Sequence, residues 1–194
     1  LFAFVGVLAL GDVEVRDVAV DGTLHVAVIE EQLRIDDGNF RRLPAGIDIA
    51  DLPEIWQFRL DFKDEGQAGD WGGVFVDLTQ YQSIRIGEWW ESQGHQYDGI
   101  AWYRVDFDVP ASAKGQQLAL SFGAVDESAW VYLNGVLIGE HDESDTGWDK
   151  RFEIALGDAV KIGESNTLAV RVRDRSNYGG IWKLVKLVGE KRAD

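Results

Sequence analysis

The sequence predicts an all-β chain of short strands and tight turns. Apolar residues alternate with polar ones over short segments, and this two-residue period is typical of a half-buried strand. The 194 residues include 22 glycines, which supply tight turns, and no long segment shows the 3.6-residue period of a helix. Because 45% of the residues are hydrophobic, we expect a folded chain with a substantial core, built as one domain or as one domain with a subdomain.

The first 50 residues predict a small β unit and a connector. We expect strands at about 1–10, 13–20 and 23–35, with a hairpin turn between the second and the third. The first of these is a run of ten apolar residues, which is too short to span a bilayer and lacks the basic leader of a signal peptide. The turn-rich segment 36–53 predicts a connector, so we place a boundary near residue 50 and divide the chain into 1–50 and 51–194.

Two interpretations of the segment 1–50 remain open. It adds extra N-terminal strands to the following domain, or it is the remainder of a preceding domain. The chain begins with a leucine and contains no methionine, so we expect it to be a piece of a longer polypeptide.

The segment 98–139 predicts a meander of strands around which the chain is organised. Between Trp102 and Val109 the residues alternate, with Tyr103, Val105, Phe107 and Val109 on one side and Trp102, Arg104, Asp106 and Asp108 on the other. Pro110 ends this strand, and the same alternation returns at 118–122 and 129–133. Asn134-Gly135 supplies the two residues at positive φ that a tight hairpin needs. Further alternating strands are expected at 56–60, 151–156 and 167–173.

Several motifs carry a resemblance to a known family. Their order along the chain is GIAWYRVDFDVP, FGAVDESAWVYLNGVLIGEH, GWDKRFEI, NTLAVRVRD and GGIWKLVKL. Over roughly 56–188 this order resembles the N-terminal sugar-binding domain of the β-galactosidase and β-glucuronidase group of glycoside hydrolases. The resemblance implies a jelly-roll β-sandwich, galactose-binding-domain-like, spliced into a larger glycosidase or carbohydrate esterase, with a secreted or periplasmic bacterial enzyme favoured.

The charge of the chain excludes some partners. A formal net charge of −15 repels phosphate backbones and anionic membrane surfaces, so we expect neither nucleic acid nor a membrane as partner. The acidity suits a neutral glycan, a cation or simple solubility, whereas an anionic polysaccharide would need an arginine or a bridging cation. No cysteine is present, which excludes disulfides and thiolate metal sites.

An acidic loop predicts a structural calcium site. The segment 61–71 carries four carboxylates within ten residues, and calcium requires six to eight oxygen ligands on a flexible loop. We take Asp61, Asp64 and Glu65 as the candidate ligands, and we expect no other cofactor. The spacing matches no EF-hand, so a solvated acidic loop is the alternative.

Three polar loops predict a carbohydrate-binding rim. The loop 88–99 mixes aromatic residues with carboxylates, the combination that stacks a sugar ring and binds its hydroxyl groups. One of its two tryptophans should fold into the core, and we expect Trp90 or Tyr97 to be exposed. The candidate ligand-binding residues of the three loops are Trp90, Glu91, Tyr97, Asp98, Trp148, Asp174 and Tyr178.

The third loop, 174–180, carries the most specific part of the resemblance. In the resembled enzymes an acidic residue here, followed by a glycine-isoleucine-aromatic step, reaches toward the sugar in the neighbouring catalytic barrel, and Asp174 would take its place. Gly179-Gly180 would allow a close backbone approach. The family continues with arginine after the aromatic residue, whereas this chain has Lys183. The alternative is that Asp174 pairs with a neighbouring arginine or caps a turn.

No catalytic constellation emerges from the sequence. It contains no nucleophile elbow, zinc-protease helix motif or phosphate-binding loop, and no strand-helix rhythm of a catalytic barrel. We therefore predict a noncatalytic carbohydrate-binding module whose partners are an oligo- or polysaccharide and the catalytic domain of the same polypeptide. The alternative function is an architectural sandwich that packs on a catalytic domain and binds no sugar.

Overall fold

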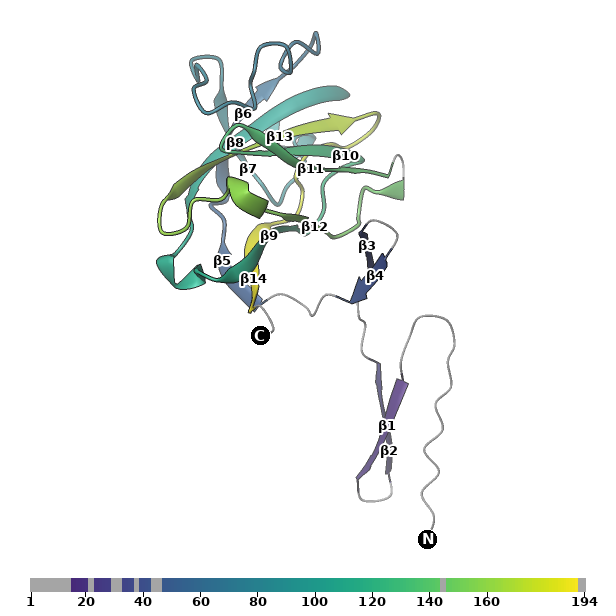
Figure 1. Cartoon of the computed structure of the whole chain (residues 1–194). Helices are drawn as coiled ribbons and strands as arrows, with labels where there is room; N and C mark the ends of the chain where they lie inside the picture. Colours follow the sequence, from purple (N-terminus) through teal and green to yellow (C-terminus); the bar gives the residue numbers. More distant parts are fainter. Residues whose placement is uncertain are drawn as a thin grey trace. The chain divides into compact units, whose positions relative to one another are not determined.

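The fold was analysed in a computed structural model of the chain (Figure 1). It describes the backbone of residues 15–20, 23–28, 33–36, 39–42 and 191, and the backbone and side chains of residues 47–143 and 146–190. The chain divides into two compact units, Leu1–Gly46 and Ile47–Asp194.

The first unit contains two antiparallel hairpins. Strand β1 (Val15–Val20) pairs with β2 (Thr23–Val28), and Val20 lies opposite Thr23, as expected for a hairpin at this point. Strand β3 (Leu33–Asp36) pairs with β4 (Asn39–Arg42). The single strand expected over 23–35 is therefore wrong, because its two halves pair with different partners. The strand expected over 1–10 lies outside the described residues.

The second unit is a sandwich of two antiparallel sheets (Figure 1). The six-stranded sheet has the order β11-β10-β13-β8-β6-β7, and the four-stranded sheet has the order β12-β9-β14-β5. The strands are β5 (Ile47–Asp51), β6 (Ile55–Leu60), β7 (Gln82–Arg85), β8 (Gly99–Asp108), β9 (Gln116–Phe122), β10 (Ser128–Leu133), β11 (Val136–Asp142), β12 (Phe152–Ala155), β13 (Ser165–Asp174) and β14 (Val185–Lys191). From β8 to β14 the chain crosses repeatedly between the sheets. The β-sandwich predicted from the sequence is confirmed.

Helix is scarce in the described residues. The 3-10 helices η1 (Glu91–Gln93), η2 (Ala111–Ala113) and η4 (Gly157–Ala159) have three residues each. Within the part of the chain that the structure describes, no helix has both the length and the apolar character needed to cross a bilayer.

The core lies between the two sheets. The side of β8 that was predicted to be apolar, from Tyr103 to Val109, is buried with residues of both sheets in one cluster. Other large members of this cluster are Trp56, Phe58, Trp90, Leu120, Phe122, Leu133, Leu168 and Leu187. Burial of these side chains is the main stabilising contribution, at about 1.5–3 kcal/mol for each large apolar side chain.

Strand β5 belongs to the sandwich. It pairs with β14, with Ala50 opposite Leu187 and Asp51 opposite Lys186. The boundary between the compact units therefore falls between Gly46 and Ile47, and residues 47–50, which the sequence analysis assigned to the connector, form part of the four-stranded sheet.

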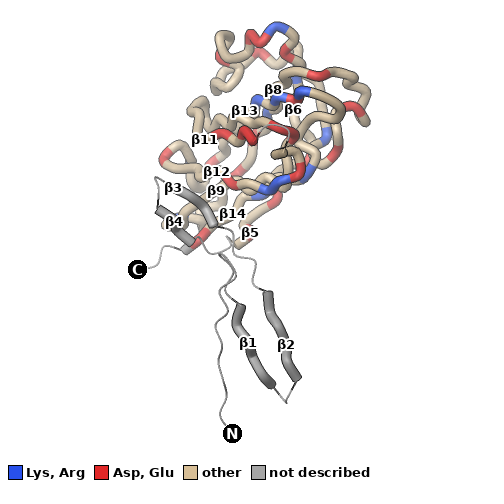
Figure 2. Tube along the Cα trace, turned by 90° about the vertical axis from the view of Figure 1, so that its right-hand side faces the viewer, with Lys and Arg blue, Asp and Glu red and all other residues tan. Residues whose placement is uncertain are grey.

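The outer face of the six-stranded sheet carries a row of alternating arginine and tryptophan. Arg59, Trp102, Arg171 and Trp130 lie opposite one another on β6, β8, β13 and β10. The guanidinium of Arg171 lies 4.3 Å from the ring centre of Trp130, a cation–π distance. Figure 2 shows the basic residues gathered along β6, β8 and β13.

The loop 61–81 covers part of this outer face. Trp71 packs against Trp102 and Ile100 in a second buried cluster. Arg104 donates hydrogen bonds to the carbonyl oxygens of Gly73 (2.7 Å) and Val74 (2.6 Å), so its buried charge is satisfied by loop backbone. Both Trp102 and Arg104 are buried, although the alternation assigned them to the side facing away from the core.

Asp61 holds the start of this loop. Its carboxylate accepts hydrogen bonds from the backbone N–H groups of Glu65 (2.8 Å) and Gly66 (2.9 Å) and from the indole N–H of Trp102 (3.0 Å). Asp61 is 2% exposed, and its bonds from Gly66 and Trp102 are buried, so solvent cannot replace the carboxylate for these two donors.

Replacing Asp61 should therefore destabilise the fold. We expect Asp61→Ala to lower the free energy of unfolding by about 3 kcal/mol, because three donors lose their acceptor. Urea unfolding followed by tryptophan fluorescence measures this loss. Asp108→Ala, at the exposed end of β8, is the matched control and should change stability by less than about 0.5 kcal/mol. Equal effects of the two substitutions would contradict the assigned role of Asp61.

Candidate functional site

A pocket of about 460 Å³ lies where several loops meet at one end of the sandwich. These are the loop after β7, the turn between β9 and β10, the loop after β11 and the loop after β13. Its lining residues are Trp89, Asp126, Glu127, Trp148, Ser176, Asn177 and Tyr178. The pocket therefore combines aromatic rings with buried carboxylates.

Four neighbouring rings lie at one side of the pocket, and we call Trp89, Trp148, Tyr178 and Trp182 the aromatic wall; Trp182 lies behind the three that line the pocket. The rings of Trp89 and Trp182 stack at 4.4 Å with an interplanar angle of 20°, and Trp148 continues the stack 5.7 Å from Trp182. Tyr178 lies 5.9 Å from Trp89. Trp148 is 45% exposed and Tyr178 is 58% exposed, so both rings offer surface to a ligand.

A hydrogen bond fixes part of the wall. The indole N–H of Trp182 donates to the backbone carbonyl of Trp148 at 2.6 Å. The ammonium of Lys183 lies 4.3 Å from the ring centre of Trp182. The wall is therefore held by contacts within its own loops, which limits the entropy that a ligand must remove on binding.

The other component of the pocket is an acidic cluster, formed by Asp126, Glu127 and Asp174. Each offers an oxygen, and these oxygens lie within 4.8 Å of one another. All three residues are buried, at 5%, 5% and 2% exposure. Glu91 lies beside the cluster, where its Oε2 accepts a hydrogen bond from the backbone N–H of Gly179 at 3.0 Å.

The cluster has fewer donors than acceptors. Glu127 accepts from the backbone N–H of Arg175 (2.7 Å), and Asp174 Oδ1 accepts from the backbone N–H of Ser176 (2.7 Å). Glu91 Oε1 is a buried oxygen without a hydrogen-bond partner, whereas Asp126 Oδ2 and Asp174 Oδ2 receive no donor from any other residue, and a side-chain hydrogen bond joins these two carboxyl groups when one is protonated. Buried carboxylate oxygens without donors are costly, so they mark this cluster as a place for a ligand or a proton.

The backbone beneath the pocket leaves no room for extra atoms. A Cβ at Gly179 would lie 2.3 Å from the Trp90 ring and 2.7 Å from Asp174 Oδ2. Gly180 has φ +115°, a value that favours glycine. Glu127 holds φ 48° in the turn between β9 and β10, an uncommon conformation for a residue with a side chain. Such conformations gather at binding sites, where the surrounding structure holds them.

Burial changes the protonation of the cluster. Desolvation, followed by repulsion from Asp174 and Glu127, raises the pKa of Asp126 to about 8. Desolvation also raises the pKa of Asp174 to about 6, against the lowering effect of the hydrogen bond from Ser176. Both carboxyl groups therefore hold protons at pH values where an exposed aspartate would be ionised.

The structure brings together several of the residues predicted to bind a ligand. Trp148 and Tyr178 belong to the aromatic wall, Asp174 to the acidic cluster, and Glu91 lies beside that cluster. Asp98 is exposed and raises the pKa of Asp174 by charge repulsion. Asp174 accepts the backbone N–H of Ser176, as the alternative of a turn-capping role expects, and its role in ligand binding stays a prediction.

Trp90 and Tyr97 lie elsewhere. The expectation of an exposed Trp90 is wrong, since it is fully buried and packs 5.9 Å from Phe58. The turn that begins η1 directs Trp90 into the core beneath Gly179 and leaves Trp89 at the rim. Tyr97 is half-buried and packs edge-on against Phe62 at 5.0 Å, outside the pocket lining.

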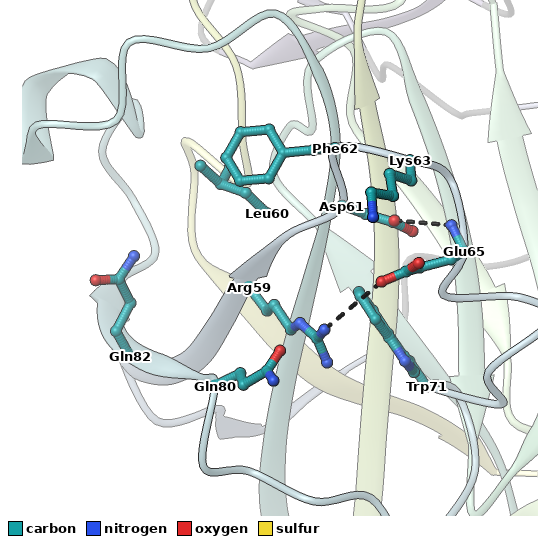
Figure 3. Close-up of a pocket in the computed structure, with 9 residues that line it drawn as sticks. All are labelled: Arg59, Leu60, Asp61, Phe62, Lys63, Glu65, Trp71, Gln80 and Gln82. Carbon is teal, nitrogen blue, oxygen red and sulfur yellow. Dashed lines mark hydrogen bonds and ion pairs between the residues drawn. The ribbon is translucent and has the colours of Figure 1, made fainter.

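The residues proposed for calcium have other partners. Asp61 accepts the three hydrogen bonds described above, Asp64 pairs with Arg171 at 2.8 Å, and Glu65 lies 3.9 Å from Arg59. Asp61 and Glu65 border a second hollow of about 490 Å³, where Figure 3 shows Arg59 reaching toward Glu65 beside Trp71. Calcium at this loop stays a prediction. Among the described residues, the group whose oxygens converge closely enough for a metal ion is the acidic cluster.

Sequence reasoning missed Asp126, Glu127 and Trp182. Asp126 and Glu127 lie in the segment AVDESAW, where the alternation of apolar and polar residues predicts only the start of the following strand. Two consecutive acidic residues between apolar ones were the available signal, because they predict buried carboxylates next to a strand end. No comparable signal distinguishes Trp182 from a core tryptophan.

The fold and the site define an all-β sandwich domain with a pocket formed by its loops, and comparison with known proteins specifies the family. The family described as "Beta-galactosidase second all-beta domain" matches residues 75–177, more than half of the chain. The chain belongs to this family. The description places the domain second among the all-β domains of its enzymes, whereas the sequence analysis expected the N-terminal sugar-binding domain.

Similar proteins are glycosidases much longer than this chain. A β-glucuronidase of Formosa agariphila is 31% identical over 115 residues, which are 56% of this chain and 11% of that protein. A β-galactosidase of Thermoanaerobacter pseudethanolicus is 34% identical over 106 residues, which are 47% of this chain and 14% of that protein. The chain thus spans about a tenth to a seventh of these relatives.

Solved structures share the fold. A β-glucuronidase from Ruminococcus gnavus in complex with D-glucuronic acid superimposes with a TM-score of 0.64 over 72% of this chain and 29% of that chain, at 19% identity. At this identity the likeness concerns the fold alone.

The acidic cluster predicts a pH-dependent stability. In the unfolded chain, Asp126 and Asp174 release their protons near the ordinary aspartate pKa of 3.8. In the folded chain, Asp126 has a pKa of about 8 and Asp174 of about 6, so the folded state binds more protons than the unfolded state between pH 3.8 and these two pKa values. The stabilisation is full below pH 4 and is lost as the pH rises through about 6 and then about 8.

We therefore expect Asp126→Asn to stabilise the chain increasingly as the pH rises from 5 to 8.5. The gain at pH 8.5 should be about 3 kcal/mol, because the amide avoids the buried charge. Urea unfolding at each pH measures the difference between variant and parent. Asp108→Asn, at an exposed position, is the control, and its difference from the parent in the free energy of unfolding should not change with pH. If the difference for Asp126→Asn did not change with pH either, the raised pKa assigned to Asp126 would be contradicted.

Proposed function

We propose that this chain is the carbohydrate-recognising β-sandwich domain of a larger glycoside hydrolase. The observation that carries the proposal is the pocket itself, in which half-exposed aromatic rings face buried carboxylates. Aromatic faces bind the C–H faces of pyranose rings, and carboxylates accept hydrogen bonds from sugar hydroxyl groups. The relatives support the proposal, since they are named as β-glucuronidases and β-galactosidases.

The proposed role is recognition, with bond cleavage located in another part of the polypeptide. The exposed rings of Trp148 and Tyr178 would stack a sugar residue, while Asp126 and Glu127 would orient its polar groups. The pocket volume of about 460 Å³ suits one or two sugar residues. A shallow site of this kind should bind with a dissociation constant between about 1 mM and 1 μM.

A second candidate function is packing against a catalytic domain. An exposed apolar patch at the hairpin between β10 and β11 favours it. Phe75 is 101% exposed, and Val136 (53%) and Val74 (39%) are exposed close by, where Gly135 of the hairpin approaches Val74. The patch shares no residue with the pocket, so the two functions are compatible.

Removing either exposed ring should weaken sugar binding. We expect Trp148→Ala and Tyr178→Ala each to raise the dissociation constant for a bound oligosaccharide about tenfold, through lost stacking. A glycan array identifies the oligosaccharide, and isothermal titration calorimetry measures the constants. Phe75→Ala removes an exposed ring outside the pocket and should leave binding unchanged. If no glycan binds at about 10 mM, roughly ten times the weakest dissociation constant considered, or if neither pocket variant differs from the Phe75 control, the proposal fails.

A further inference from the structure

The second hollow lies where the chain leaves β6 and where it returns to β7, and Figure 3 shows it in close-up. Its lining combines two cations, Arg59 and Lys63, with the ring of Phe62 and the amides of Gln80 and Gln82. It shares no residue with the pocket beside the aromatic wall, so it is a separate candidate site.

Arg59 enters this hollow with its hydrogen-bond donors unused. Its guanidinium lies 3.6 Å from the ring centre of Trp71, and this contact holds the group in place. Its ion-pair partner is Glu65 at 3.9 Å, close to the longest distance that counts as an ion pair. Arg59 donates no hydrogen bond to any residue that the structure describes. A guanidinium carries five N–H donors in a rigid fork, so Arg59 offers a positioned fork to a ligand.

Arg59 differs in this respect from two other arginines of the six-stranded sheet. Arg104 donates to the carbonyl oxygens of Gly73 and Val74, and Arg171 pairs with Asp64 at 2.8 Å. Figure 2 shows basic residues along β6, β8 and β13, although the net charge of the whole chain is −15. The loop that covers the face thus occupies Arg104 and Arg171 and leaves the donors of Arg59 to a partner from outside.

The groups around Arg59 are also available. Lys63 is exposed and forms no ion pair with a described residue. Gln80 and Gln82 are exposed, and their amides make no hydrogen bond within the described part of the chain. Phe62 is 71% exposed, and its ring is supported edge-on by Tyr97 at 5.0 Å. Amides bind sugar hydroxyl groups as both donors and acceptors, and an exposed ring binds the C–H face of a pyranose.

We propose that the second hollow is a binding site for an anionic saccharide, whose carboxylate or sulfate group is held by Arg59 and Lys63. The fork of Arg59 matches two oxygens of one anionic group, and Lys63 adds a second positive charge. The ring of Phe62 and the two glutamine amides contact the rest of the sugar. Arg59 therefore supplies the arginine that an anionic polysaccharide requires in so acidic a chain. This site adds to the pocket and does not depend on it.

Two carboxylates of the hollow oppose an anion to different extents. Asp61 is 2% exposed, and its oxygens already accept three hydrogen bonds from the loop and from Trp102. The side chain of Glu65 is 55% exposed, and at this exposure its ion pair with Arg59 is weak. Glu65 can turn toward solvent when an anion arrives, so it lowers the affinity without blocking the fork.

Affinity electrophoresis of the full 194-residue chain at pH 7 tests the proposal. The acidic polymers in the gel are polygalacturonate, glucuronan, chondroitin sulfate and κ-carrageenan, and the neutral counterparts are methyl-esterified polygalacturonate and desulfated carrageenan. We expect at least one acidic polymer to retard the chain and added salt to reduce the retardation. The uronate and sulfate polymers together identify which anion is preferred. Isothermal titration calorimetry with an oligosaccharide of the retarding polymer then gives the dissociation constant.

Two substitutions in the hollow should change the affinity in opposite directions. Arg59→Gln should weaken binding of the acidic oligosaccharide about tenfold, because the charged fork is lost. Glu65→Gln should strengthen it about threefold, because the competing carboxylate is removed. A gain of affinity cannot come from damage to the fold, and thermal unfolding checks the folding of both variants. Lys114→Gln removes an exposed cation outside the hollow and is the control, with unchanged binding expected.

Three outcomes overturn the inference. The first is that no acidic polymer retards the chain, and the second is that an acidic polymer and its neutral counterpart bind equally. The third is that Arg59→Gln binds the acidic oligosaccharide as tightly as the parent chain. Trp148→Ala distinguishes this site from the pocket, since it should leave binding of the acidic oligosaccharide unchanged. If Trp148→Ala abolishes that binding, the ligand belongs to the pocket, so the inference fails while the proposed function stands.

Discussion

The register of β9 against β14 is the constraint on which the site depends. Val185 lies opposite Phe122, and the pairing continues beyond the strands through bonds from Gly123 N–H to the carbonyl of Leu184 (3.0 Å) and from Asp126 N–H to that of Gly180 (3.0 Å). The turn that carries Asp126 and Glu127 is thereby held along the loop that carries Trp182. A shift of one residue would turn every side chain of the strand to the opposite face, so core packing and site geometry are specified together.

The site places carboxyl groups where burial opposes their ionisation. The acidic cluster is enclosed at the end of the core, with raised pKa values at Asp126 and Asp174. Elsewhere in the described residues, the buried charges of Asp61 and Arg104 have hydrogen bonds supplied by loop backbone, and the buried Arg171 pairs with Asp64 but leaves its Nε without a partner. Natural proteins retain costly, incompletely satisfied groups mainly where a ligand uses them.

The sequence predicted the architecture better than the site. Alternation along β8 identified the core side, because a strand with one face in the core needs that pattern, and the Asn134-Gly135 hairpin follows from turn chemistry. The pattern could not show that the loop 61–81 also buries Trp102 and Arg104 on the outer face. Which of two adjacent tryptophans faces the core depends on a single turn before η1, and the carboxylates of the β9–β10 turn meet Asp174 only through long-range pairing. Such contacts leave no local signature.

The close packing of Gly179 against Trp90 limits how this rim could change during evolution. The backbone under the pocket rests directly on a core side chain, so an alteration of the turn would require rebuilding the interior as well. The side chains of Trp148 and Tyr178 are less constrained, since they are partly exposed and line the pocket without supporting the sheets. Descendants of this domain could thus acquire new ligand preferences by exchanging those two side chains, while the glycine turn stayed the same.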